Sequence, residues 1–129
     1  MLLDTTFLID AERGTSDLDD LIADDDDTAV AAITLAELLV GVRLAAGTHR
    51  AARQTFADAV ASAIPIIAYD VHVAHAHAEL LVAARRSGRP RGAHDLIIAA
   101  TAVSSGRTVV TADPIGFEGL PGVELLRYR

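Results

Sequence analysis

The stretch from His94 to Asp113 constrains the fold more than any other part of the chain, because it combines a helix, a turn and a strand. Its helical part is apolar almost all round, as in a helix packed on both sides. Thr108–Thr111 (T-V-V-T) follows, with the composition of a buried strand. A helix of about 10 residues rises about 15 Å, and a strand of about 5 residues covers about 16 Å. The chain therefore returns to one edge, where we expect Asp95 and Asp113 to face each other.

Strands and helices alternate along the rest of the chain. We expect strands at 1–4, 28–33, 64–68 and 123–126, and helices at 7–12, 17–23, 34–44, 48–62 and 71–86. Thr5 and Thr6 are expected to cap the first helix, and Asp70 is expected to cap the helix at 71–86. The run Asp24–Asp27 is expected to be a solvated loop. This order predicts an α/β fold, a three-layer α/β/α arrangement around a central, mostly parallel sheet. At 129 residues, we expect a single domain over residues 1–129.

Composition narrows the class of protein. Hydrophobic residues make up 51% of the chain but aromatic residues only 4%, so the core must be built from aliphatic side chains. No apolar run reaches the ~18 residues of a membrane span, and the N-terminus lacks the features of a signal peptide. The chain has no cysteine, which excludes disulfides and thiolate metal sites. We therefore expect a cytoplasmic protein without a membrane partner.

The absence of lysine excludes two classes of phosphate-handling protein. All 11 basic residues are arginine, and the net charge is −7. Without a lysine the chain cannot form a P-loop, and it does not fit a phospho-acceptor receiver domain. A negative net charge argues against a nucleic-acid partner, unless several of the carboxylates bind divalent cations.

Four acidic residues fall at the carboxyl ends of the expected strands. They are Asp4 after the first strand, Glu37 after the second, Asp95 at the start of the last helix and Asp113 after the fourth strand. Ligands of a parallel sheet bind at this edge, where the strand order reverses. Clustered carboxylates repel one another, so the group implies a compensating cation. Oxygen ligands favour Mg²⁺ or Mn²⁺, which activate water and stabilise charge on a phosphate.

Each acid also has a purely local interpretation. Asp4 and Asp113 are common turn residues at strand ends, and a helix N-terminus by itself stabilises Asp95. Thr34–Glu37 (T-L-A-E) is a capping-box pattern, in which Glu37 would only reach back to a backbone N–H. Four acids at one edge together favour a metal site.

The same residues resemble a known family along essentially the whole chain. The similar segments are L-L-D-T-T-F-L-I-D at 2–10, T-L-A-E-L-L-V-G-V at 34–42, H-D-L-I-I-A-A-T-A at 94–102 and V-V-T-A-D at 109–113. In this order and spacing they are similar to the PIN-domain ribonucleases of the VapC toxin type. The resemblance implies metal-dependent cleavage of RNA by Asp4, Glu37, Asp95 and Asp113, a homodimer, and neutralisation by a cognate VapB-like antitoxin. The chain departs from the family at Gly116, which stands where a second acid is common and leaves the number of bound metals open.

We therefore expect an endoribonuclease toxin of a type II toxin–antitoxin system that uses Mg²⁺, with Mn²⁺ as a substitute. Asp4 and Asp95 would bind the metal directly, Glu37 would bind it or orient the attacking water, and Asp113 would complete the metal site. Thr6 is expected to hydrogen-bond an acid or the scissile phosphate.

Arg89 and Arg91 are candidate phosphate contacts. Two alternatives remain: a DNA nuclease of the same fold, and a regulatory or scaffold domain that binds Mg²⁺ without cleavage.

Overall fold

The central sheet is built from short parallel strands. The structure, a computed structural model, describes residues 1–14 and 27–127. Its strands are β1 (Leu2–Leu3), β2 (Val30–Ala31), β3 (Ile66–Ile67), β4 (Val109–Thr111) and β5 (Leu125–Arg127). β4 pairs with β1 and β5, and β2 pairs with β3, all parallel. A parallel bridge between Leu2 and Ala29 joins the two groups. The resulting order is β3-β2-β1-β4-β5, so the strand order reverses between β1 and β4.

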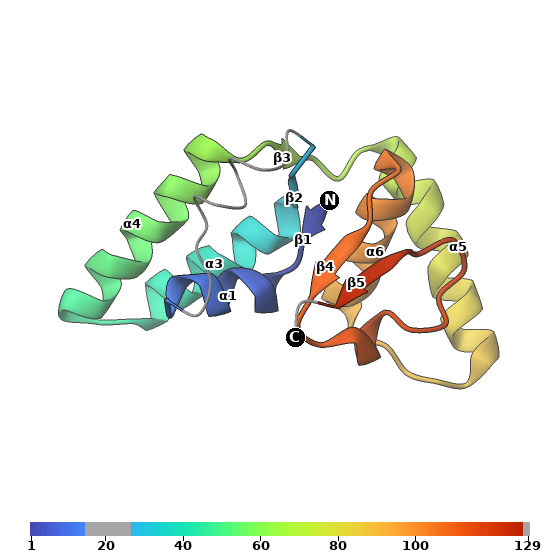
Figure 1. The fold of residues 1–129 in the computed structure, drawn as a ribbon. Coiled ribbons are helices and arrows are strands. Elements are labelled where there is room, and N and C mark those ends of the chain that lie inside the picture. Colours follow the sequence, from blue (N-terminus) through green and yellow to red (C-terminus); the bar gives the residue numbers. More distant parts are fainter. Residues whose placement is uncertain (15–26, 128–129) are drawn as a thin grey trace.

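Helices cover both faces of this sheet. They are α1 (Thr5–Glu12), α3 (Ala32–Leu44), α4 (Gly47–Ala63), α5 (Val71–Ser87) and α6 (Ala93–Ser105), with a 3₁₀ turn η1 (Pro114–Gly116) after β4. Figure 1 shows α1, α3 and α4 on one side of the strands and α5 and α6 on the other. The expected three-layer α/β/α fold is confirmed.

The core divides along the pleat of the strands. Leu2 and Val109 pack with α5 and α6, whereas Leu3 and Val110 pack with α1, α3 and α4. All four side chains are at most 3% exposed. Alternate residues of a strand point to opposite faces, so both faces of β1 and β4 are buried. This fixes the register of the two strands and hence the position of their carboxyl ends.

Helix ends that carry strong local signals agree with the sequence. Asp70 accepts a hydrogen bond from the Val73 backbone N–H at 3.1 Å and is the N-cap of α5. Gly88 and Gly106 end α5 and α6 in the left-handed conformation, with φ of 68° and 67°. Glycine adopts this conformation without the steric cost that a Cβ imposes.

Two expected helix starts are wrong. The N-cap of α1 is Asp4, which accepts from the Phe7 N–H, and neither Thr5 nor Thr6. Helix α3 begins at Ala32, two residues before Thr34, with Ala31 as an N-cap that makes no side-chain bond. Thr34 is therefore an interior residue, fully buried, and the capping box with Glu37 does not form.

The strands are shorter than expected, because the chain leaves the sheet as soon as a helix begins. β2 covers only two residues of 28–33, and β5 lies at 125–127 in place of 123–126. The expected helix at 17–23 and most of the acidic run at 24–27 lie outside the described residues. Within the described residues, no helix is both long enough and apolar enough to cross a membrane.

Candidate active site

Asp4 and Asp113 stand at the ends of the two adjacent strands where the strand order reverses. The Asp4 N–H donates to the Val110 carbonyl at 3.1 Å, which holds the end of β1 against β4. The Asp4 side chain is buried, and its Oδ1 caps α1 through the Phe7 N–H at 2.9 Å. Asp113 is exposed and precedes η1, to which it makes no capping bond.

Thr6 ties this pair of strand ends together. Its hydroxyl donates to Asp4 at 2.8 Å (Oδ1) and 3.0 Å (Oδ2), and it accepts from the Ala112 backbone N–H at 3.3 Å. The prediction that Thr6 hydrogen-bonds an acid is confirmed. Thr111 continues the link, since its hydroxyl accepts from the Asp113 N–H at 2.9 Å. The two threonines thus fix the backbone on which Asp4 and Asp113 stand.

Glu37 reaches the site from the second turn of α3. Its Oε1 accepts a 2.7 Å hydrogen bond from the Thr5 hydroxyl, and its Oε2 lies 3.4 Å from His94 Nδ1. Both contacts cross between elements far apart in sequence, from α1 to α3 and from α6 to α3. The side chain therefore points to the sheet edge, away from its own helix start.

Asp95 lies in the first turn of α6, opposite the loop that follows β4. Its carboxylate packs against the backbone of Gly92 and Gly116, where a Cβ on either residue would meet Asp95 Oδ2. The side chain is partly buried. Asp113 contributes to the raised pKa of Asp95, so the two carboxylates lie in the same region. That they face each other stays a prediction.

The electrostatics show that all four acids share one region. Burial raises the pKa of Asp95, and the charges of Asp4, Glu37 and Asp113 raise it further, while His94 opposes them. Burial also raises the pKa of Asp4, against the hydrogen bonds from Thr111, Phe7 and Thr6 and with a further contribution from Asp113. The region therefore carries more negative charge than its protein surroundings compensate, which is a condition that a cation would relieve.

The side chains suit a hard cation by chemistry but are not gathered around one point. Among residues 1–14 and 27–127, no three acidic or histidine side chains stand in an arrangement that would hold a metal ion. The carboxylates of Asp95 and Asp113 accept no hydrogen bond within those ranges, so their oxygens are available. Carboxylate oxygens are the donors that Mg²⁺ and Mn²⁺ take. The donor set fits such an ion, and Asp95 and Glu37 would turn from their present contacts to bind it.

Arg89 and Arg91 lie beside the 114–122 loop, which follows β4. Arg91 Nη2 donates to the Glu118 carbonyl at 2.6 Å, whereas the Arg89 side chain is exposed. A Cβ on Gly119 would lie 3.5 Å from Arg89 Nη1 and 3.6 Å from Arg91 Nη2. The two arginines thus flank the 114–122 loop rather than touch the acids, and their contact with a phosphate stays a prediction.

Two residues of the site were missed in the sequence. Thr5 and His94 both contact Glu37, and each directly precedes a residue that was singled out, Thr6 and Asp95 respectively. A polar residue in the first turn of a helix, next to a candidate ligand, is the signal that could have found them.

Comparison with known proteins identifies the fold. A PIN-domain family model matches residues 1–121. Ribonuclease VapC5 of Mycobacterium tuberculosis is 36% identical over 129 residues, covering 98% of this chain and 93% of the relative. The VapBC-5 toxin–antitoxin structure from the same species contains a chain 35% identical, with a TM-score of 0.79 over 98% of this chain and 96% of that one.

A second solved structure is closer in shape. It is VapBC2 from Rickettsia felis bound to a promoter DNA fragment, with a TM-score of 0.89, 26% identity, and coverage of 99% of this chain and 98% of that one. The matches extend over almost the whole chain in each comparison. The chain belongs to the PIN-domain family and, within it, to the VapC type.

Proposed function

We propose that this chain is a Mg²⁺-dependent endoribonuclease, with Mn²⁺ as a substitute, and the toxin of a type II toxin–antitoxin pair. The observation that carries the proposal is the position of four acids at the carboxyl ends of the strands: Asp4 follows β1, Asp113 follows β4, Asp95 lies in the first turn of α6, and Glu37 reaches across to Thr5 of α1 and His94 of α6. The charges of Asp4, Glu37 and Asp113 also raise the pKa of Asp95. The ribonuclease name of a relative 36% identical along the chain supports the substrate class. Because that substrate is cellular RNA, we place the activity in the cytoplasm.

The surroundings of each acid suggest how it would take part in metal binding. Asp4 is fixed by Thr6 and the Phe7 N–H, so it would hold the cation with little motion. Asp95 has free oxygens and would hold it after turning from Gly116. Asp113 is exposed at the mouth of the site and would complete the metal's ligands. A bound divalent cation would lower the pKa of water and offset the charge of the phosphate.

Glu37 is suited to a second task. Its Oε1 is held by Thr5, while Oε2 faces His94. It would bind the cation directly or through water, or orient the water that attacks phosphorus in line with the leaving oxygen. Thr6 would keep Asp4 in register, and the exposed Arg89 would lie on the phosphate side of the substrate.

Two protein partners follow from the same proposal. The similar solved structures are toxin–antitoxin complexes, so we propose a cognate VapB-like antitoxin. We also propose a homodimer, because large apolar side chains are exposed on α3 and at the start of α5, among them Val40 at 55%, Leu44 at 82% and Val71 at 62%. Light scattering at micromolar concentration tests this, and a stable monomer would contradict it.

A cleavage assay on labelled RNA and on DNA of the same sequence tests the enzyme proposal. We expect no cleavage in EDTA, recovery with Mg²⁺ or Mn²⁺, and none with Ca²⁺, whose looser coordination positions an in-line attack poorly. An Asp4→Asn variant is the control for contaminating nuclease. Undiminished cleavage in chelator would overturn the metal mechanism. Cleavage of DNA alone would reassign the substrate, and metal binding without any cleavage would leave a Mg²⁺-binding domain.

A further inference from the structure

The α5–α6 corner gathers the densest positive charge of the chain. Four of the 11 basic residues, Arg85, Arg86, Arg89 and Arg91, fall within seven positions, although the net charge is −7. None of the four forms an ion pair with a carboxylate in the described ranges. Arginines in the last turn of a helix favour its C-terminus, which accounts for Arg85 and Arg86. It does not account for the two that follow the end of the helix at Gly88.

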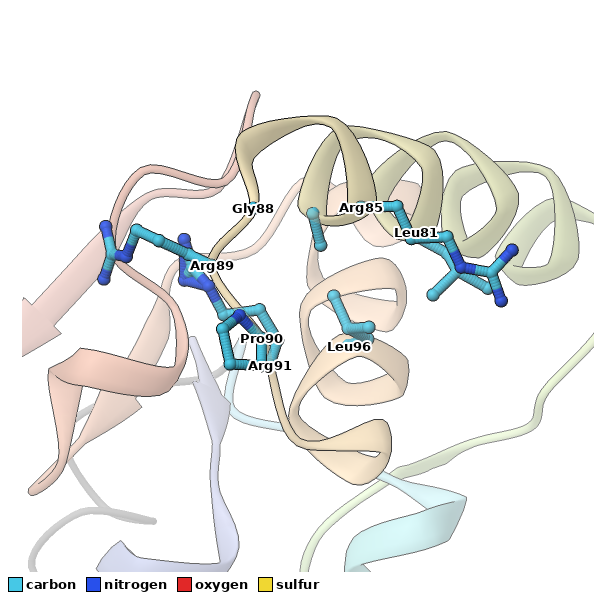
Figure 2. Close-up of a pocket in the computed structure, with 8 residues that line it drawn as sticks. Leu81, Arg85, Gly88, Arg89, Pro90, Arg91 and Leu96 are labelled. Carbon is cyan, nitrogen blue, oxygen red and sulfur yellow. The ribbon is translucent and has the colours of Figure 1, made fainter.

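Arg85, Arg89 and Arg91 border a pocket with an apolar floor. The cavity, about 340 Å³, lies between α5 and α6 and is lined by Leu81, Ala84, Arg85, Gly88, Arg89, Pro90, Arg91 and Leu96. In Figure 2, Leu81 and Leu96 come from the two helices, and Arg85 and Arg89 extend to opposite sides of Leu96. The volume is at the lower end of the range for small-molecule sites. An apolar floor between two exposed guanidinium groups suits a base whose neighbouring phosphates are bound on either side.

Arg91 has a different environment from Arg89. One of its nitrogens donates to the Glu118 carbonyl, and its Nε and Nη1 are buried without a hydrogen-bond partner in the described part of the chain. A phosphate cannot reach buried atoms, so Arg91 supports the 114–122 loop. Arg85 and Arg89, both exposed, are the groups that can meet a ligand.

The 114–122 loop connects the pocket to the acidic site. Gly116 packs against Asp95, and Gly119 packs against Arg89. Three residues span at most about 10 Å of chain, so Arg89 lies within a few nucleotides of Asp95. An RNA strand bound across the acidic edge would therefore also contact these arginines. Their positive charge would bind its phosphates, which the acidic edge repels.

We propose that Arg85 and Arg89, around the floor formed by Leu81 and Leu96, bind the sugar–phosphate backbone of the RNA strand a few nucleotides from the scissile bond. This inference rests on the proposed ribonuclease function. Guanidinium groups bind phosphate oxygens in pairs, and an apolar floor accepts any base. The pocket thus supplies affinity without selecting a sequence.

Fluorescence anisotropy with a labelled single-stranded RNA of about 12 nucleotides tests the pocket. The assay is run in EDTA and at several salt concentrations, so that binding is measured without cleavage. Arg85→Gln/Arg89→Gln should weaken binding at least tenfold, and the slope of log K against log salt should become shallower by about 0.7 per arginine removed. Arg43→Gln, an exposed arginine near the end of α3, is the matched control and should leave the slope unchanged.

Several outcomes separate this pocket from the proposed function. Equal RNA binding by the double variant and the wild type would overturn the pocket and leave the function standing. Arginine-dependent RNA binding by a protein that cleaves no RNA would support the pocket while the function fails. If the double variant loses binding to oligoglutamate but keeps binding to RNA, the pocket takes an acidic protein segment and the proposal is overturned. With Mg²⁺, the double variant should cleave the RNA of about 12 nucleotides with a raised KM.

Discussion

Gly116 leaves the space that the Asp95 carboxylate occupies. A Cβ built on Gly116 would overlap Asp95 Oδ2 and lie 3.0 Å from Cγ. Any side chain at position 116 therefore competes with Asp95 for the same volume. Asp95 therefore folds back onto the loop after β4, into the volume that a side chain at position 116 would fill.

The contact predicts coupling between positions 116 and 95. Gly116→Ala should lower the free energy of unfolding by about 0.5–1.5 kcal/mol, because the Asp95 side chain must turn away from the new Cβ into a less favourable rotamer. In an Asp95→Ala background the overlap is gone, so the same change should cost almost nothing. Gly116 does not adopt a positive φ, so backbone strain does not enter. Urea denaturation in EDTA measures both costs, and equal costs in the two backgrounds would show that Asp95 does not fill this space.

Glu37→Gln separates a role in the site from a role in helix stability. The capping box is already excluded, since α3 begins at Ala32, and glutamine can still accept the hydrogen bond from Thr5. We expect an unchanged or higher melting temperature without metal, because one like charge near Asp95 is removed. Mn²⁺ binding by calorimetry should weaken, and cleavage should fall by two orders of magnitude or more. Near wild-type cleavage would leave a site of three acids.

Arg91 and Arg89 are predicted to differ although only one residue separates them. Arg91→Gln removes the donor to the Glu118 carbonyl, which should cost on the order of 1 kcal/mol or more and speed hydrogen exchange in the 114–122 loop. Arg89→Gln removes an exposed side chain, so it should change stability by less than about 0.5 kcal/mol. Mass-spectrometric hydrogen exchange on the two variants provides the comparison. Similar loop protection in both would show that Arg91 does not hold the loop.

The parts of the site that follow from backbone geometry were predictable from sequence. The rise of the helix and the length of the strand were enough to predict that Asp95 and Asp113 lie at one edge of the sheet. The strand pattern predicted that Asp4 lies at the same edge. The Thr34–Glu37 pattern misled because a capping box is a local signal: the helix start is set by where the β2 backbone leaves the sheet, and that depends on pairing with β3.

Side-chain contacts between elements that are distant in sequence could not be predicted from the sequence pattern. Thr5 and Glu37 are 32 residues apart, and His94 meets Glu37 only because α6 packs against α3. Such contacts depend on rotamers and on helix placement, which periodicity does not encode. The overlap of Gly116 with Asp95 belongs to the same class, since it requires the path of the loop after β4.

The pH dependence of stability should report the uncompensated charge on Asp95. Its pKa is raised from 3.8 in the folded protein, by burial and then by Asp4, Glu37 and Asp113. The folded state therefore holds the proton more tightly than the unfolded chain, and stability falls as pH rises from about 3.8 through the raised pKa. Asparagine has nearly the same shape and does not ionise. In EDTA, Asp95→Asn should match the wild type at the acid end of this window and become more stable than the wild type above it.

Added Mn²⁺ should reverse that order at neutral pH. The wild type gains stability from binding the cation, whereas Asp95→Asn has lost a ligand and should gain much less. Asp58→Asn, an exposed change on α4, is the control and should follow the wild type under both conditions. Chemical denaturation between pH 4 and pH 8, with and without Mn²⁺, supplies the measurement. An Asp95→Asn protein less stable than the wild type at pH 7 in EDTA would mean that the Asp95 charge stabilises the metal-free fold, and the account of a repulsive acidic cluster would have to be abandoned.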